Sequence, residues 1–332
     1  RTQSDHISSA ANSALDLAKG DFVALLDQDE VLADHALAAV AKAIEGHPEA
    51  GLIYSDEDKI DDHGHRFSPQ FKPDWDEFLL RSQNYIGHLA VIRRDLVVHE
   101  RGFDPDMEGA HEYDLVLRCV DSIAPKDVLH IPHILCHRHQ SGEKDVSREP
   151  HAQRALEHGL QAVKAHLSRK CIAAEVILNN SIYRVKYATP DPAPKVSLII
   201  LTRDRPELLT KCVQSLINGT DYENIEIIIV DNGTINEEAL SMIRDFSADE
   251  RVTILRDDSP FNFSHLNNKA AEIATGKYLC LVNNDIEVLN RRWLQELVSI
   301  GVQSGVGAVG ARLYYPDGLL QHAGVVLGIE GI

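Results

Sequence analysis

The chain contains one segment twice, and this internal repeat constrains its fold more than any other feature. Residues 8–32 align without a gap on residues 264–288, and Asp285 follows its counterpart Asp29 by 256 positions. Seven of the 25 aligned positions are identical, and most others keep their apolar or polar character. A period of this length is too long for a solenoid repeat, and it indicates one type of domain that occurs twice.

The repeat also predicts that neither copy is whole. A chain of 332 residues cannot hold two full copies of a domain that repeats every 256 residues. We therefore expect residues 1–187 to be the C-terminal part of a first domain and residues 196–332 to be the N-terminal part of a second. Residues 188–195, with three prolines, are expected to form a stiff extended linker. The alternative is one large domain with a coincidental internal match.

Composition excludes some classes of function. The net charge is −18, and no Lys/Arg cluster is longer than a pair, which argues against a nucleic-acid backbone as the main partner. The acidic excess is compatible with a protein that holds a divalent metal. The five cysteines are scattered without a CxxC motif, which favours buried free thiols. No apolar run approaches the ~18 residues that span a bilayer.

The second half of the chain alternates between apolar runs and amphipathic stretches. The apolar runs, which we expect to be buried strands, are residues 196–201, 225–230, 252–255 and 278–282. Helices are expected from Pro206, over 237–246 and over 264–275. This alternation predicts an α/β fold with a Rossmann-like, mostly parallel sheet.

The first half of the chain shows the same alternation of strands and helices, but it begins with a helix and lacks the strands that come first in the second half. Its expected helices cover residues 8–18, 34–45, 76–82 and 111–121. Its expected strands cover residues 22–26, 51–55, 88–97 and 181–187. The fold class is therefore α/β in both halves, with two incomplete domains in tandem.

Polar motifs follow several of the expected strands. They are Asp27-Gln28-Asp29, Thr202-Arg203-Asp204, Asp231-Asn232 and Asn283-Asn284-Asp285. In open α/β sheets, ligands bind at the carboxyl ends of the strands. Acids gathered there repel one another unless a cation relieves the repulsion, and hard oxygen ligands suit Mg²⁺ or Mn²⁺. The alternative is that these residues begin turns or cap helices.

These motifs resemble family 2 glycosyltransferases with the GT-A fold. The segments that carry the resemblance in the second half are IILTRDRPELLTKCVQSL, EIIIVDNGT and FNFSHLNNKAAEIATGKYLCLVNNDIEVL, followed by GVGAVGARLYYPDGLLQHAGVVLG. Those in the first half are LLDQDEVL, YSDEDKID, RFSPQFKPDWDEFLLRSQNYIGHLAVIRRDL, GAHEYDLVLR and HIPHILCHRH. The subgroup that this chain resembles makes bacterial O-antigen, rhamnan and related surface polysaccharides, often with tandem transferase domains.

The resemblance implies an inverting transfer of a hexosyl group from a nucleoside-diphosphate sugar. The divalent metal (Mn²⁺ or Mg²⁺) would be held by Asp27, Asp29 and His137 in the first copy and by Asp285 in the second. Glu112 falls at the position of the general base, which a carboxylate can fill if burial raises its pKa. Asp114 is a second candidate for the base, or else braces the helix through Arg118. The histidines of residues 130–139 are alternatively a zinc site, although their spacing matches no structural zinc motif.

The resemblance also implies a nucleotide-sugar site in the second copy. Its expected residues are Thr202, Asp204, Asp231, Asn283 and Asp285. Asp231 would accept a hydrogen bond from a pyrimidine imide, unless it is only a turn residue.

The implied partners are a nucleoside-diphosphate sugar donor and a saccharide or lipid-linked saccharide acceptor. The implied location is the cytoplasm, with peripheral membrane association at the inner face of the plasma membrane as a further expectation.

One departure from the family pattern leaves a second function open. Asn283 stands where the first copy has Asp27, so Asp285 is the only anionic ligand of that motif in the second copy. A catalytically inactive module that binds carbohydrate or nucleotide is therefore the alternative. A nucleotidyltransferase is disfavoured, because residues 202–206 lack the glycine of a phosphate-binding loop.

Overall fold

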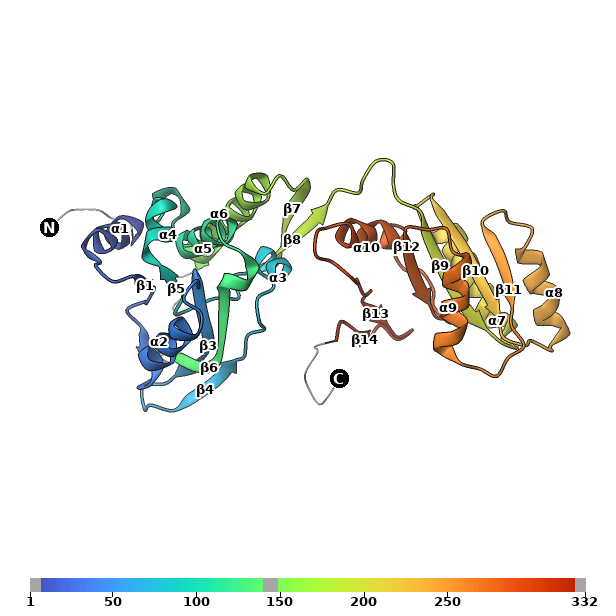
Figure 1. Ribbon diagram of the computed structural model, residues 1–332, viewed down its shortest axis with the longest axis horizontal. Coiled ribbons are helices and arrows are strands. Elements are labelled where there is room, and N and C mark those ends of the chain that lie inside the picture. The colour runs from blue at the N-terminus through green and yellow to red at the C-terminus, as the bar shows by residue number, and fades with distance from the viewer. Residues whose placement is uncertain (1–6, 140–148, 326–332) are drawn as a thin grey trace. The chain divides into compact units, whose positions relative to one another are not determined.

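The computed structural model describes residues 7–139 and 149–325, and the chain divides into two compact units, Arg1–Lys186 and Tyr187–Ile332 (Figure 1). Each unit has its own sheet and its own helices. The α/β class predicted from the sequence is thus confirmed. Within the described part of the chain, none of the helices combines the length and the apolar character needed to cross a membrane.

The second unit is built on a parallel sheet of four strands. They are β9 (Val196–Thr202), β10 (Ile225–Asp231), β11 (Val252–Arg256) and β12 (Tyr278–Val282). Their order in the sheet is β11-β10-β9-β12, and every neighbouring pair is parallel, as predicted. The connecting helices are α7 (Pro206–Gly219), α8 (Glu237–Phe246) and α9 (Phe263–Ile273), and α10 (Trp293–Gly301) follows β12. A short pair, β13 (Leu313–Tyr314) and β14 (Leu320–His322), lies after α10.

Helices cover both faces of this sheet, which explains why its strands read as continuous apolar runs. On one face Leu198 and Ile200 of β9 pack with the apolar stripes of α7 and α10. On the other face Ile199 of β9 packs with Leu266 and Ala270 of α9. Successive residues of a strand point to opposite faces, so one short strand supplies both cores.

A half-buried carboxylate ties three strands of the second unit together. Glu226 of β10 accepts hydrogen bonds from Ser197 Oγ of β9 at 2.5 Å and from Lys195 Nζ at 3.0 Å. It also accepts from the backbone N–H groups of Thr275 and Gly276, just before β12, at 2.6 and 3.1 Å. These bonds fix the start of β12 beside β9.

The first unit has a sheet of six strands. They are β1 (Phe22–Ala24), β2 (Glu30–Leu32), β3 (Leu52–Ile60), β4 (Arg66–Gln70), β5 (Val91–Arg93) and β6 (Val128–His139), in the order β1-β5-β3-β6-β2 with β4 beside β3. Only β3 and β6 are parallel, and the other pairs are antiparallel. The mostly parallel sheet expected from the sequence is therefore found in the second unit alone. A short turn such as that between β3 and β4 allows only antiparallel pairing, whereas β3 and β6 are separated by several helices.

Helices flank this sheet and lead to the second unit. They are α1 (Ile7–Leu17), α2 (Ala36–Gly46), α3 (Glu77–Ser82), α4 (Arg94–His99), α5 (His111–Asp121) and α6 (Glu149–Arg169). Val40 of α2 packs on Ile53 and Leu135 of the sheet. The chain then forms the two-stranded ribbon of β7 (Ala174–Asn179) and β8 (Ile182–Tyr187).

The strand expected over residues 88–97 is wrong in its second half. Only Val91–Arg93 is extended there, and α4 begins at Arg94. A short apolar run does not distinguish a strand from a buried helix, and Asp95 in the first turn favours the helix through its dipole.

The sequence repeat is also a repeat of structural elements. The helices α1 and α9 begin and end at residues 256 positions apart, Ile7–Leu17 and Phe263–Ile273. The strands β1 and β12 begin at Phe22 and Tyr278, with the same offset. In the first unit β1 pairs with β5, and in the second unit β12 pairs with β9. The two units thus each contain this helix and strand at the same spacing, but the strand has an antiparallel partner in the first unit and a parallel partner in the second.

Replacing Glu226 with Gln should lower the free energy of unfolding of the second unit by about 2 kcal/mol at pH 7, because bonds to a charged acceptor are lost. Burial acts to raise the pKa of Glu226, but its hydrogen bonds outweigh burial and lower the pKa from 4.5 to about 2. The stabilisation is therefore complete above about pH 4.5 and disappears as the pH falls toward 2. Denaturant unfolding at several pH values measures this, with exposed Glu223→Gln as the control. Equal stability of both variants would contradict the role of Glu226.

Candidate functional site

A pocket of about 360 Å³ lies at the carboxyl ends of the parallel strands in the second unit. Thr202 ends β9, Asn232 follows β10, and residues 283–285 follow β12. Phe261 of the loop before α9 and Phe263, the first residue of α9, add two aromatic side chains. The strands are in register, with Asp231 opposite Thr202, so the residues that follow each strand meet at one edge of the sheet.

Three of the predicted nucleotide-sugar residues meet in this pocket. Thr202, Asn283 and Asp285 all line it, although Asp285 lies 83 positions after Thr202 in the sequence. Thr202 is buried, and its Oγ1 lies 3.4 Å from Asn284 Nδ2. Asn283 and Asp285 are exposed and open to a ligand. Arg203 contributes a cation to the same pocket.

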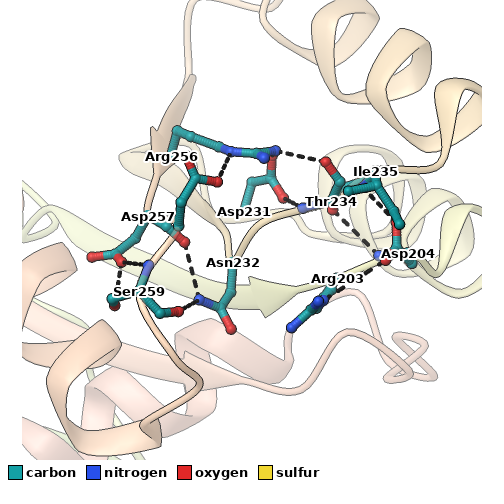
Figure 2. Close-up of polar contacts among 10 residues, drawn as sticks. Arg203, Asp204, Asp231, Asn232, Thr234, Ile235, Arg256, Asp257 and Ser259 are labelled. Carbon is teal, nitrogen blue, oxygen red and sulfur yellow. Dashed lines mark hydrogen bonds and ion pairs between the residues drawn. The ribbon is translucent and has the colours of Figure 1, made fainter.

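Asp231, expected to contact a pyrimidine, has a different role in the structure. Its Oδ1 accepts from the backbone N–H of Thr234 at 2.9 Å, and its Oδ2 accepts from Arg256 Nη1 at 2.5 Å (Figure 2). The residue is only 2% exposed and is not among those that line the pocket. Its two oxygens are already engaged, so Asp231 acts as a brace between β10 and β11.

Asn232 occupies the position that was expected of Asp231. Its Nδ2 donates to the backbone carbonyls of Asp257 at 3.0 Å and Ser259 at 2.8 Å (Figure 2). Those two bonds use both N–H groups of the amide and fix its orientation. Its Oδ1 is buried and is without a hydrogen-bond partner among the described residues. The sequence pointed to this motif, but only the contacts of Asp231 with Arg256 and Thr234 show that Asn232, and not Asp231, has an oxygen without a partner.

Asp204, another expected nucleotide-sugar residue, does not line the pocket and instead binds the backbone of a neighbouring loop. Its Oδ1 accepts from the backbone N–H groups of Ile235 and Asn236, both at 2.8 Å, and these bonds lower its pKa. Its own φ is 48°, a left-handed conformation that is uncommon for a residue with a side chain. Asp204 thus joins the loop after β9 to the loop after β10, and its neighbour Arg203 faces the pocket.

The first unit has a second candidate site, formed by Asp27, Glu30 and His88. Atoms of the two carboxylates and the imidazole that can bind a metal all lie within 4.8 Å of one another. Glu30 Oε2 accepts from the backbone N–H of Asp27 at 3.0 Å, and Oε1 contacts His88 Nδ1. The hydrogen bond to Glu30 raises the pKa of His88, although burial opposes it. Glu30 therefore holds both other residues in place.

The position of His88 is also fixed by a contact between its backbone and the ion pair of Lys72 and Glu57. Lys72 Nζ donates to Glu57 Oε2 at 2.7 Å, and the same oxygen accepts from the backbone N–H of His88 at 3.1 Å. Gly87 has a φ of +59°, and a Cβ atom there would come within 2.8 Å of Glu57. This contact could not be predicted from the sequence, because it depends on how β3 and β5 pair.

Glu112, the expected base, lies beside this cluster at the start of α5. Burial is the main cause that raises its pKa from 4.5 to about 7, and the negative charge of Asp27 adds to the effect. Asp114, the second candidate, is buried and pairs with Arg118 at 2.7 Å. Arg118 also donates to the backbone carbonyl of Gly102 at 2.8 Å, so Asp114 braces α5 and is not available as a base.

Two expected metal ligands do not join this cluster. Asp29 lies 3.6 Å from Arg138, and its backbone carbonyl accepts from the N–H of His139. His137 Nδ1 is 2.5 Å from Asp58 Oδ1. In β6 the adjacent Cys136 contacts Glu30, so His137 points to the opposite face of the sheet.

The zinc alternative has no support in the described residues. His130 pairs with Asp56 and Asp74, and His137 pairs with Asp58. The group of possible metal ligands found in the described part of the chain is the one formed by Asp27, Glu30 and His88.

Comparison with known proteins identifies the family. Residues 1–99 and 197–323, more than half of the chain, match the model of glycosyl transferase family 2. The chain therefore belongs to this family, and the resemblance seen in its motifs is confirmed.

Two relatives match nearly the whole chain. An uncharacterised protein of Sinorhizobium fredii is 41% identical over 338 aligned residues, which cover 100% of this chain and 37% of the relative. The O-antigen biosynthesis protein RfbC of Myxococcus xanthus is 40% identical over 323 residues, covering 97% of this chain and 25% of the relative. The chain thus spans between a quarter and two fifths of the length of these relatives.

Among solved structures, the mannosyltransferase PcManGT from Pyrobaculum calidifontis is similar to part of the chain. The match is 22% identical with a TM-score of 0.34, and it covers 37% of this chain and 36% of the mannosyltransferase.

The raised pKa of Glu112 predicts a pH-dependent stability that requires no substrate. The protonated carboxyl is favoured in the folded first unit, so its ionisation destabilises the fold as the pH rises from 4.5 through 7. Glu112→Gln should remove this loss, which is on the order of 3 kcal/mol at pH 8.5.

Chelator-treated protein should show the effect in denaturant unfolding at pH 5 and pH 8.5. Glu45→Gln on the exposed side of α2 is the control, and it should leave the loss intact. If Glu112→Gln behaved like this control, the carboxyl would not be buried as the structure describes.

Proposed function

We propose that the parent protein is an inverting glycosyltransferase and that the two units supply complementary parts of its chemistry. In this proposal the second unit is part of one transferase domain and binds the nucleotide of a nucleoside-diphosphate sugar. The first unit is part of a different transferase domain and holds its base and its metal ligands. The observation that carries the proposal is the half-buried carboxyl of Glu112 near Asp27, with a pKa raised mainly by desolvation, at the start of a helix in a chain of this family.

Glu112 has the properties of a general base near neutral pH. Its pKa of about 7 leaves a substantial fraction ionised and also makes the carboxylate basic enough to take a proton. The proton of the acceptor hydroxyl would pass to Glu112 as the hydroxyl oxygen bonds to the anomeric carbon. The bond from that carbon to the diphosphate breaks on the opposite side, so the configuration inverts.

Asp27 and His88 are the proposed ligands of a divalent cation. The carboxylate of Asp27 and the imidazole of His88 have donor atoms within 4.8 Å of each other, so both can bind one Mn²⁺ or Mg²⁺ ion. Glu30 contacts His88 and accepts from the backbone of Asp27, which fits a supporting carboxylate that fixes ligand orientation. A bound cation would neutralise the charge that develops on the leaving diphosphate.

In the second unit, Asn232 and Thr202 are the proposed contacts of the nucleotide. The unpartnered Oδ1 of Asn232 needs a hydrogen-bond donor, and a ring N–H of uracil or guanine supplies one. Arg203 is placed to bind phosphate oxygens by virtue of its charge. Asp204 and Asp231 hold the loops that carry these residues.

The proposed acceptor is a saccharide or lipid-linked saccharide of a growing surface polysaccharide. The name of the Myxococcus relative, an O-antigen biosynthesis protein, supports this class of acceptor. A hexosyl donor, a cytoplasmic location and contact with the inner face of the plasma membrane stay predictions from the family resemblance.

A second function is favoured by one observation in the second unit. Asn283, Asn284 and Asp285 line the pocket, and Asn283 stands at the position of Asp27 in the first copy. The motif of the second copy therefore has one carboxylate fewer than that of the first. A unit of this kind would bind a nucleotide sugar without turnover. Measured release of nucleoside diphosphate separates the two functions.

Exchange of metal ligands tests the cation site directly. Asp27→Asn and His88→Leu should each weaken Mn²⁺ binding about tenfold or more, because each removes a ligand. Asp29→Asn and His137→Gln are matched controls, since the structure places both residues away from the cluster. Electron paramagnetic resonance of free Mn²⁺ measures the affinity. Weakening by Asp29→Asn and His137→Gln, with none by His88→Leu, would show that the ligands are those expected from the sequence.

A chimera tests the division of labour between the units. Residues 195–282 of the second unit, joined to residues 27–187 of the first, should form one domain, because β12 and β1 are equivalent strands of the repeat. We expect this chimera to release nucleoside diphosphate from a donor sugar in the presence of Mn²⁺. Glu112→Gln in the chimera should lower turnover by about a hundredfold or more and leave donor affinity nearly unchanged, since a base acts on the chemical step.

Donor binding and turnover together distinguish a catalytic role of Glu112 from a structural one. If the folded chimera binds a donor and Glu112→Gln leaves turnover intact, Glu112 is not the base. If Glu112→Gln abolishes donor binding, its role is structural.

A further inference from the structure

Two aromatic rings at the rim of the second-unit pocket are more exposed than large apolar side chains usually are. Phe261 is 65% exposed and Phe263 is 52% exposed, and both line the pocket. An exposed pair of large apolar rings beside a concave polar surface marks a place where a ligand binds.

The backbone that carries these rings is fixed at both ends. At its start, Asn232 Nδ2 binds the carbonyls of Asp257 and Ser259 (Figure 2). At its end, Asn262 caps α9 by accepting from the N–H of His265 at 3.0 Å. Phe261 is therefore exposed on a loop that is anchored on both sides, and Phe263 is exposed in the first turn of α9.

The same side chain that anchors this loop also offers the free acceptor of the pocket. In Figure 2 the amide nitrogen of Asn232 points to residues 257–259, and its oxygen lies on the other side. That oxygen is buried and unpartnered among the described residues. A planar ring with an N–H on its edge would satisfy it, and the face of such a ring would be open to an aromatic side chain.

We propose that Phe261, supported by Phe263, is the stacking surface for the base of a nucleoside diphosphate whose ring N–H bonds to Asn232. This rests on the proposed nucleotide site and assigns the residue that binds the face of the base. Base–aromatic stacking tolerates different bases because each has a π-face, so Phe261 supplies affinity. Asn232 then supplies the preference for a base with a ring N–H.

Calorimetry with UDP on the full chain tests this assignment. Phe261→Leu should weaken UDP binding about tenfold, from the loss of stacking. Phe261→Tyr should restore it, because the ring is kept. Tyr315→Leu, a control at another exposed aromatic of the second unit that does not line the pocket, should have no effect. Circular dichroism checks that each variant folds.

The outcomes separate this inference from the proposed function. Unchanged UDP affinity in Phe261→Leu would overturn the stacking role and leave the nucleotide site in place. Weakening in Phe261→Tyr equal to that in Phe261→Leu would also overturn it, since both variants would then act through a property other than the ring. If the unmodified chain binds neither UDP nor GDP, the nucleotide site itself is wrong, and the stacking role is wrong with it.

Discussion

The in-register parallel pairing of β9 with β10 and β12 is the constraint on which the second unit depends. Because Thr202 lies opposite Asp231, the residues that follow each strand are delivered to one edge of the sheet. Apolar burial on both faces holds this register, since a slip of one residue would turn Ile199 and Ile200 to the wrong cores. The polar pocket is thus a consequence of how the apolar strands pack.

The first unit has a different constraint, which is a group of neighbouring carboxyls in which ionisation of one member is disfavoured. Glu112 and Glu30 lie beside Asp27, and burial together with like charge disfavours ionisation of Glu112. Such an arrangement costs stability in the absence of a cation or substrate. Proteins keep groups with perturbed pKa values mainly at functional sites, which is why this cluster is the better candidate for chemistry than the other ion pairs of the unit.

The sequence predicted the fold better than it predicted the site. Continuous apolar runs fixed the four parallel strands, because burial on both faces leaves a direct mark in the sequence. The place of Glu112 at the start of a helix could also be predicted, since its motif begins a segment of clear helical periodicity. By contrast, the roles of Asp231 and Asn232 depend on Arg256, and those of His88 and His137 depend on strand pairing and on the face of the sheet. These contacts arise from residues far apart in the chain, and a single sequence does not reveal them.

We propose that nucleotide binding and metal binding belong to different units of this chain. Calorimetric titration of UDP and of Mn²⁺ onto the separately expressed units, residues 1–186 and 187–332, tests this division. The second unit should bind UDP, and the first unit should bind Mn²⁺ but not UDP. Binding of UDP to the first unit, with none to the second, would contradict it.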